Sequence, residues 1–273
     1  GVFNFCHFDA YIGLALREYG EFSEIELSLM QSFINPGDVV FDIGANIGCF
    51  SIPFSHKVGS KGRVLSFEPQ KFICKLLRKN ARDNNLKNIK IFNQAIGRKK
   101  AFIELDKFDY SKLGNFGGIT LTKNYDNSKC ADIVEGKKYK VKVTNLDNFI
   151  GIEKCNFVKM DVELMEMEVL NGGKKFLDKF RPILWIENHF NPNNPNKINK
   201  YLIENDYLPY WTKAKLFNKD NYFINEKDYY ENLVTMNTLA IPLEQKKFYR
   251  IDSLEKIHTP FTKPKLCLTS PLK

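Results

Sequence analysis

Stretches of apolar residues alternate with amphipathic stretches along most of this chain. The apolar runs have the length and content of strands that are buried on both faces, as in a parallel sheet. Strand–helix alternation at this spacing is typical of right-handed βαβ units. The predicted strands are residues 39–43, 63–68, 89–96, 156–161 and 182–187, with two later ones at 207–211 and 237–241. The predicted helices are residues 24–34, 47–58, 69–84, 165–180 and 198–203.

This pattern predicts an α/β fold with a mostly parallel seven-stranded sheet and helices on both faces. It is interrupted at residues 97–145, where short alternating pieces surround a glycine-rich stretch, so we expect a β-rich insertion that covers a site. No repeat or second core pattern follows, and residues 1–245 are interpreted as a single domain. The basic, proline-containing segment 246–273 is expected to be a loosely ordered tail or to wrap the surface.

The start of the first long helix carries a local signal. Ser23 and Glu26 have the spacing of a capping box, in which each side chain bonds a free backbone N–H at the helix start. We therefore expect the helix to begin directly after Ser23.

Composition narrows the functional classes. The 273 residues are 43% hydrophobic and 14% aromatic, which supports a packed core. The net charge of +9 would attract polyanions, but no dense basic run occurs, so solvent-facing lysines are the simpler interpretation. The six cysteines have no metal-finger spacing, which favours a reduced, cytoplasmic setting. We see no signal peptide and predict no membrane span.

Two acidic residues end neighbouring predicted strands. Asp42 is followed by a turn with Gly44 and Gly48, and Glu68 closes the next strand. Carboxyl ends of parallel strands bind ligands in such folds, and a carboxylate in the position of Glu68 is the usual partner of a ribose diol. Because the fingerprints of dinucleotide sites and P-loops are missing, we predict another nucleoside-containing ligand and not NAD or a nucleoside triphosphate.

These motifs resemble those of the FkbM family of S-adenosylmethionine-dependent methyltransferases, over about residues 9–242. The resemblance is carried by residues 39–48, 66–69, 146–149, 158–163, 166–170 and 185–189. It implies a Rossmann-like class I methyltransferase fold with S-adenosyl-L-methionine as the cofactor. The cofactor-binding residues that it implies are Asp42, Gly44, Ala45, Asn46, Glu68, Pro69, Gln94, Ala95 and Asp161.

One position departs from the family pattern. The family usually has glycine after the glutamate that corresponds to Glu163, and this chain has Leu164. A leucine disfavours positive φ and would fill space near the expected reaction centre. This residue therefore raises the alternative of a cofactor-binding module with lost or weak turnover.

Four residues are candidates for the chemistry. A hydroxyl acceptor loses a proton during methyl transfer, so a base within hydrogen-bond reach helps. The candidates are Asp161, Glu163, Glu187 and His189, and the imidazole has an ordinary pKa of about 6.5 that suits a base near neutral pH. Clustered carboxylates also suit Mg²⁺ or Ca²⁺, but no full ligand set is visible and we predict no metal.

The favoured function is O-methylation of a sugar or other polyhydroxylated small molecule or glycan by a cytoplasmic enzyme. An RNA methyltransferase is the alternative motivated by the net charge of +9. The acceptor and the oligomeric state stay open.

Overall fold

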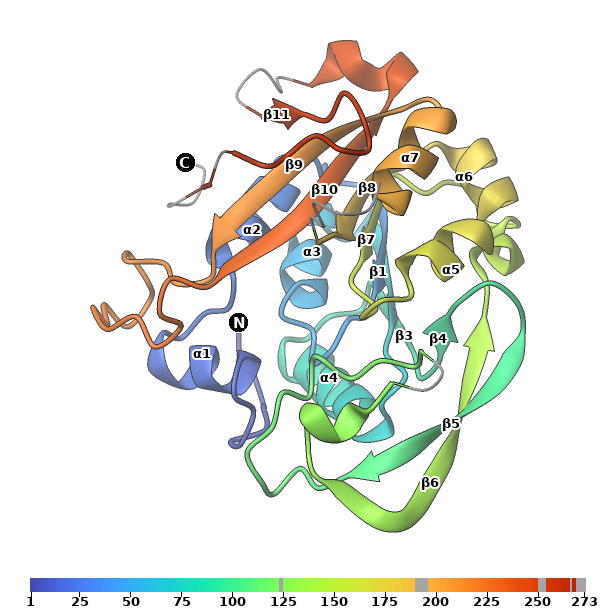
Figure 1. Ribbon diagram of the computed structural model, residues 1–273. Helices are drawn as coiled ribbons and strands as arrows, with labels where there is room; N and C mark the ends of the chain where they lie inside the picture. Colours follow the sequence, from blue (N-terminus) through green and yellow to red (C-terminus); the bar gives the residue numbers. More distant parts are fainter. Residues whose placement is uncertain (123–124, 190–195, 250–253, 266, 269–273) are drawn as a thin grey trace.

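The computed structural model describes residues 1–122, 125–189, 196–249, 254–265 and 267–268, and it contains one large and one small sheet (Figure 1). The large sheet has eight strands in the order β11-β9-β10-β8-β7-β1-β2-β3. Its strands are β1 (Val39–Ile43), β2 (Arg63–Phe67), β3 (Ile89–Phe92), β7 (Phe157–Met160), β8 (Ile183–Glu187), β9 (Tyr207–Lys215), β10 (Val234–Pro242) and β11 (Glu255–Lys256).

Strand β1 is central and has parallel neighbours on both sides, β2 and β7. The parallel order continues to β3 at one side and β8 at the other, whereas β10 runs antiparallel to both β8 and β9. The predicted mostly parallel sheet is confirmed. Residues of β1 alternate between the faces, so Phe41 and Ile43 join the core on one face and Val40 joins the core on the other.

Helices cover both faces of this sheet, as predicted (Figure 1). Apolar residues of α2 (Glu24–Gln31) and α3 (Ser51–Val58) pack in the core that contains Val40. Residues of α5 (Glu166–Asn171), α6 (Lys174–Phe180) and α7 (Lys197–Glu204) pack in the core that contains Phe41. The remaining helices are α1 (Ile12–Glu18) and α4 (Lys71–Asp83), and α4 lies against β3.

Two predicted elements are each divided in the structure. The expected strand 89–96 becomes β3 in the large sheet and β4 (Ala95–Ile96) in the small one. The expected helix 165–180 breaks at Gly172 and Gly173 into α5 and α6. A Cβ on Gly172 would lie 2.2 Å from the carbonyl oxygen of Gly97, so the backbones approach too closely for any side chain.

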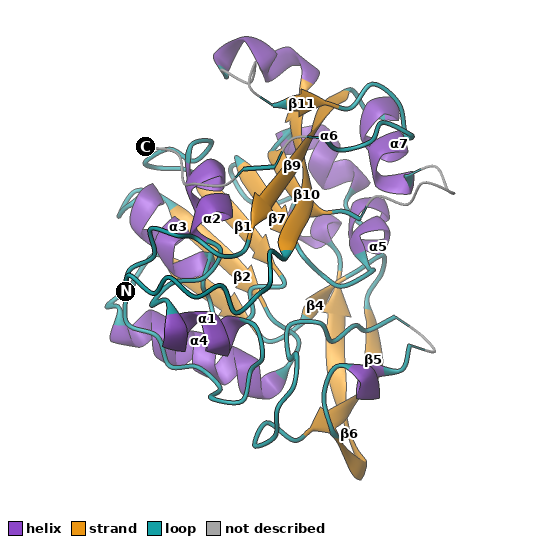
Figure 2. Ribbon diagram, turned by 60° about the vertical axis from the view of Figure 1, so that its left-hand side comes forward, coloured by secondary structure: helices purple, strands orange, loops and turns teal. Residues whose placement is uncertain are grey.

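The small sheet forms the predicted β-rich insertion and projects from the body of the molecule (Figure 2). Strands β5 (Ala101–Phe108) and β6 (Ile133–Thr144) make an antiparallel pair, and β4 joins β6 in parallel. Leu105, Val141 and Val143 on its inner face pack against the body. The 3-10 helices are η1 (Asn127–Lys129), η2 (Leu146–Phe149) and η3 (Leu243–Phe248).

The C-terminal segment adds to the large sheet. Strand β11 pairs with the edge strand β9, which gives an eighth strand beyond the seven expected, and Ile257 beside it is buried. Among the described residues, none of the helices has the length and apolar character that crossing a bilayer requires.

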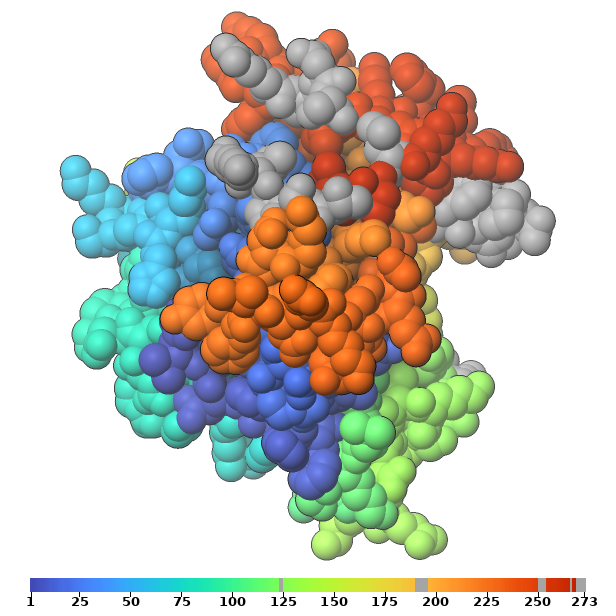
Figure 3. Space-filling view, turned by 90° about the vertical axis from the view of Figure 1, so that its left-hand side faces the viewer, coloured from blue at the N-terminus to red at the C-terminus, as the bar shows by residue number. Residues whose placement is uncertain are grey.

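The long β9–β10 loop packs on α1 at the N-terminal end of the molecule (Figure 3). The hydroxyl of Tyr230 donates to the carbonyl oxygen of Tyr11 over 2.6 Å, and the amide of Asn225 donates to the carbonyl oxygen of Glu18 over 3.1 Å. Segments more than 200 residues apart in sequence are held together in this way.

The predicted capping box at Ser23 is wrong in its bonding. Ser23 has a left-handed backbone, φ 52°, and its hydroxyl donates to Glu26 Oε2 over 2.8 Å instead of accepting from the helix backbone. The other oxygen, Glu26 Oε1, accepts from Trp185 Nε1 at 2.9 Å and from Asn237 Nδ2 at 3.2 Å. The Glu26 carboxylate therefore bonds to side chains of strands β8 and β10 and not to the backbone of its own helix.

We expect Glu26→Ala to lower the free energy of unfolding by about 2 kcal/mol, because it leaves the buried Trp185 N–H without its acceptor. Urea denaturation followed by Trp fluorescence measures the change. Glu24→Ala, at a half-buried position of the same helix, is the control and should cost much less. Equal losses in both variants would contradict the role given to the Glu26 carboxylate.

Candidate functional site

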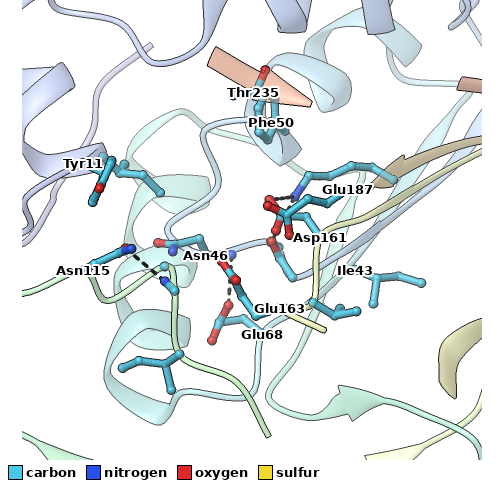
Figure 4. A pocket seen from close by; sticks show the side chains of 18 of the residues that line it. Tyr11, Ile43, Asn46, Phe50, Glu68, Asn115, Asp161, Glu163, Glu187 and Thr235 are labelled. Atoms are coloured by element: carbon cyan, nitrogen blue, oxygen red, sulfur yellow. Dashed lines mark hydrogen bonds and ion pairs between the residues drawn. The ribbon is translucent and has the colours of Figure 1, made fainter. Parts of the chain in front are cut away.

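A cavity of about 430 Å³ lies at the carboxyl ends of β1, β2, β7 and β8. This is the edge at which open α/β sheets bind ligands, and the volume is within the usual range for small-molecule sites. Its wall combines residues of these strand ends with residues of α1, the insertion and β10 (Figure 4).

The turn after β1 forms the floor of the cavity. Gly44 has φ 80°, and a Cβ there would lie 1.7 Å from the carbonyl oxygen of Asp161, so only glycine fits. The amides of Gly44 and Ala45 both donate to the carbonyl oxygen of Phe67 over 3.0 Å. These bonds fix the turn to β2 and place Asn46 beside Glu68.

Glu68 lies on the cavity wall at the end of β2. Its Oε2 accepts from the amide of Asn46 at 3.0 Å, and its Oε1 accepts from the amide of Gln70 at 2.7 Å. Burial raises the pKa of this carboxyl to about 7, although both amides favour the charged form. The group is therefore held rigidly, and its charge changes near neutral pH.

Asp42 lies elsewhere than predicted. It is fully buried and does not line the cavity, because the alternation along β1 turns its side chain under α3. Its Oδ2 accepts from the hydroxyl of Ser51 at 2.5 Å, and its Oδ1 lies 3.5 Å from Lys159 Nζ. The expectation that Asp42 contacts the ligand is corrected: it supports the site from below.

Lys159 connects this buried acid to the cavity, although it belongs to none of the predicted site residues. Its Nζ lies 3.3 Å from Asp161 Oδ2 and donates to the carbonyl oxygen of Gly44 over 3.1 Å. Burial opposes the charge, but Asp161, Asp42 and Glu26 outweigh it and raise the pKa of Lys159. A lysine inside the otherwise apolar run of β7 was the available signal, because a buried charge needs a partner.

Three predicted carboxylates meet at one end of the cavity. Oxygen atoms of Asp161, Glu163 and Glu187 all lie within 4.8 Å of one another, close enough to share a cation (Figure 4). Burial, with the neighbouring Glu187, raises the pKa of Glu163 to about 9, and burial with Asp161 raises that of Glu187 to about 7. His189 Nε2 lies 3.5 Å from Glu187 Oε1, and this hydrogen bond raises the pKa of the imidazole.

Of the predicted site residues, all except Asp42 and Gln94 line the cavity. Gly44, Ala45, Asn46, Glu68, Pro69, Ala95, Asp161, Glu163, Glu187 and His189 line the cavity. Gln94 does not: it lies at a shallow hollow on the insertion sheet. The side chain of Asn93 bonds the carbonyl oxygens of Glu68 and Pro69 and fixes the turn there, and the next residue to face the cavity is Ala95.

Several cavity residues come from segments that the motifs do not contain. Tyr11, Phe50, Asn115 and Thr235 project into the cavity from four distant parts of the chain (Figure 4). Asn115 belongs to the glycine-rich stretch of the insertion, which was the one sequence signal for such a cover. Gln70 holds this stretch, since its Nε2 donates to the carbonyl oxygen of Phe116 over 2.7 Å.

Comparison with known proteins assigns the family. Residues 42–209, more than half of the chain, match the Methyltransferase FkbM domain. The chain belongs to the FkbM methyltransferase family. The strand order and orientations described above agree with the predicted Rossmann-like class I methyltransferase fold.

Curated relatives of this FkbM chain match only parts of it. It is 27% identical to Methyltransferase 1 of Beauveria bassiana over 49% of this chain and 57% of that protein. It is 26% identical to the antimetabolite synthetase AmbE of Pseudomonas aeruginosa over 59% of this chain and 9% of that protein. A solved structure, the FkbM methyltransferase of Methylobacillus flagellatus, aligns with TM-score 0.48 and 14% identity over 78% of this chain and 50% of that chain.

Leu164, the departure from the FkbM pattern, has a left-handed backbone conformation, which glycine adopts more readily. Its φ is 71°, next to Glu163 with φ 50°. The side chain is 59% exposed and does not line the cavity, contrary to the expectation that it fills space there. The loop keeps a left-handed turn, which a leucine adopts only at a cost in backbone strain.

We expect Leu164→Gly to raise the free energy of unfolding by roughly 1 kcal/mol. Relief of the left-handed strain is worth about 1–2 kcal/mol, and the flexibility of glycine costs about 0.5–1 kcal/mol. Urea denaturation measures the difference. Leu113→Gly is the control, because Leu113 is also exposed but has no positive φ, and it should not gain stability. A loss of stability in Leu164→Gly would show that the strain assignment is wrong.

Proposed function

We propose that this FkbM chain is an S-adenosylmethionine-dependent methyltransferase that acts on a hydroxyl of a sugar or other neutral polyhydroxylated acceptor. The supporting observation is that one cavity contains both the glycine turn with Glu68 and the carboxylate group of Asp161, Glu163 and Glu187. The first arrangement suits a nucleoside, and the second suits a reacting hydroxyl.

The residues fit the cofactor in shape and charge. Gly44, Ala45 and Asn46 would bind its amino-acid part, and Glu68 would accept hydrogen bonds from its ribose hydroxyls. The Asp161 carboxylate would complement its sulfonium cation. When bound, S-adenosylmethionine supplies an electrophilic methyl group.

The acidic end of the cavity would hold the acceptor. With its pKa near 9, Glu163 carries a proton at neutral pH and can donate a hydrogen bond to an acceptor oxygen. Glu187 Oε1 lies 3.5 Å from His189 Nε2, and with a pKa of about 7 the Glu187 carboxyl has the basicity of a group that accepts the hydroxyl proton. An anionic acceptor group would lie beside Asp161 and the partly charged Glu187, so a neutral hydroxyl is favoured at the reacting position.

Cofactor binding tests the first half of the proposal. Calorimetry should show one S-adenosylmethionine per chain, with affinity that rises about tenfold from pH 6 to pH 8, as Glu68 loses its proton through its pKa of about 7. Glu68→Gln should bind at least about tenfold more weakly at pH 8 and lose the pH dependence, since it removes the carboxylate. Absence of heat with S-adenosylmethionine and with S-adenosylhomocysteine would refute the cofactor assignment.

Methyl transfer tests the second half. Tritiated S-adenosylmethionine, offered with a panel of monosaccharides and nucleotide sugars, should label a neutral sugar. We expect Glu187→Gln to reduce kcat about 100-fold or more without changing cofactor affinity, because proton acceptance is lost. Glu168→Gln, an exposed neighbour outside the cavity, is the control. Full activity of Glu187→Gln would exclude Glu187 from the reaction.

A further inference from the structure

The exposed face of α4 is a stripe of cations. Lys71, Lys75, Arg78 and Arg82 follow the i, i+4, i+7, i+11 spacing that places residues on one side of a helix, and all four are exposed. The opposite side of α4, with Ile73 and Leu77, is buried. The stripe is therefore a fixed surface feature that the linear sequence does not display as a basic run.

The part of the chain around this stripe is strongly basic. Residues 71–90 contain seven basic residues and one acidic residue, in a protein with net charge +9. The acid, Asp83, pairs with Lys79 at 3.2 Å and with Arg82 at 3.5 Å. Within the described part of the chain, Lys71, Lys75 and Arg78 have no carboxylate partner. These three cations are available to an anionic ligand.

The stripe begins one residue beyond the lining of the cavity. Gln70 lines the cavity and is the residue directly before α4, so Lys71 is the cation of the stripe nearest the site. From there the four cations extend about 16 Å along the helix axis. Next to Lys71, the half-exposed ring of Phe72 stacks on Tyr110 with ring centres 4.3 Å apart, which gives a flat apolar surface at the same end.

The cavity and the basic stripe on α4 favour different chemical groups, and both groups can belong to one ligand. The cavity ends in carboxylates and favours a neutral reacting unit, whereas the stripe favours anions. RNA carries a phosphate on every unit, so any unit in the cavity would bring negative charge toward Asp161 and Glu187. A polysaccharide in which acidic and neutral sugars alternate satisfies both regions.

The spacing of the cations agrees with such a repeat. Lys71 and Arg78, and likewise Lys75 and Arg82, are seven residues apart, which is about 10 Å along the helix and comparable to the length of a disaccharide. A membrane surface fits less well, because the apolar side of α4 is buried in the core and is not free to insert.

We propose that α4 binds a carboxylated polysaccharide and that this polymer carries the neutral sugar whose hydroxyl enters the cavity. The proposal rests on the proposed function for the identity of the reacting group. The binding surface itself stands on the charge and geometry of α4 and is testable without turnover.

The test uses the full chain and three fluorescent probes of equal length: a hyaluronan dodecasaccharide, which alternates acidic and neutral sugars, a neutral dextran and an oligouridylate RNA. Anisotropy at several salt concentrations measures binding. We expect hyaluronan to bind with an affinity that falls steeply with salt, and dextran not to bind. Lys75→Gln/Arg78→Gln should weaken hyaluronan binding about tenfold, while the control Lys174→Gln/Lys175→Gln, an exposed pair on α6, should leave it unchanged.

Tighter binding of the RNA than of hyaluronan at equal salt would assign the surface to nucleic acid and overturn the proposal. Equal binding by the α4 variant and the wild type would also overturn it. Calorimetry with S-adenosylmethionine on the same proteins separates this test from that of the proposed function. Polymer binding without cofactor binding would reject the cofactor assignment and support the binding surface on α4. Cofactor binding without polymer binding would support the cofactor assignment and reject the binding surface.

Discussion

The site depends on one buried cation at the carboxyl edge of the large sheet. Lys159 is 2% exposed and lies between Asp42 and Asp161, with the carbonyl oxygen of Gly44 as a further partner. A buried charge is stable only when its partners are held in place, and removal of one partner is costly. The lysine therefore ties the turn after β1 to the end of β7, and these are the two segments that form the floor of the cavity.

In this arrangement one acid supports the floor of the cavity and another lines the cavity. Beneath the floor, Asp42 pairs with Lys159 and accepts a hydrogen bond from Ser51. Asp161 pairs with the same lysine and lines the cavity. Gly44 allows the two backbones to approach because a side chain there would collide with Asp161. The result is a rigid edge on which Glu68 and the carboxylates at the opposite end keep fixed positions.

Charge is divided across the molecule in a way that the net value hides. Acidic groups converge inside the cavity, where burial raises the pKa values of Glu68, Glu163 and Glu187. Basic groups collect outside, above all on α4. The net charge of +9 thus does not describe the cavity, whose titratable groups are mostly acidic.

The sequence by itself determined the class of fold and most of the cavity floor. Apolar runs identify strands that are buried on both faces, and residues adjacent in the chain, such as Gly44, Ala45 and Asn46, stay adjacent in space. The alternation of side chains along β1 was also readable, but whether Asp42 faced a ligand or a helix depended on where α3 packs. Only the tertiary structure decided that.

Tertiary structure also decided which residues that are far apart in the sequence come together. Glu26 accepts hydrogen bonds from Trp185 and Asn237 and does not cap its own helix, since contacts from distant strands outweigh a local cap. Tyr11, Asn115 and Thr235 line one cavity because the insertion and the β9–β10 pair fold over the strand ends. Periodicity reports neighbours within one element, such as the basic face of α4, whereas a cavity is made by the packing of several elements, and that packing is set by the whole chain.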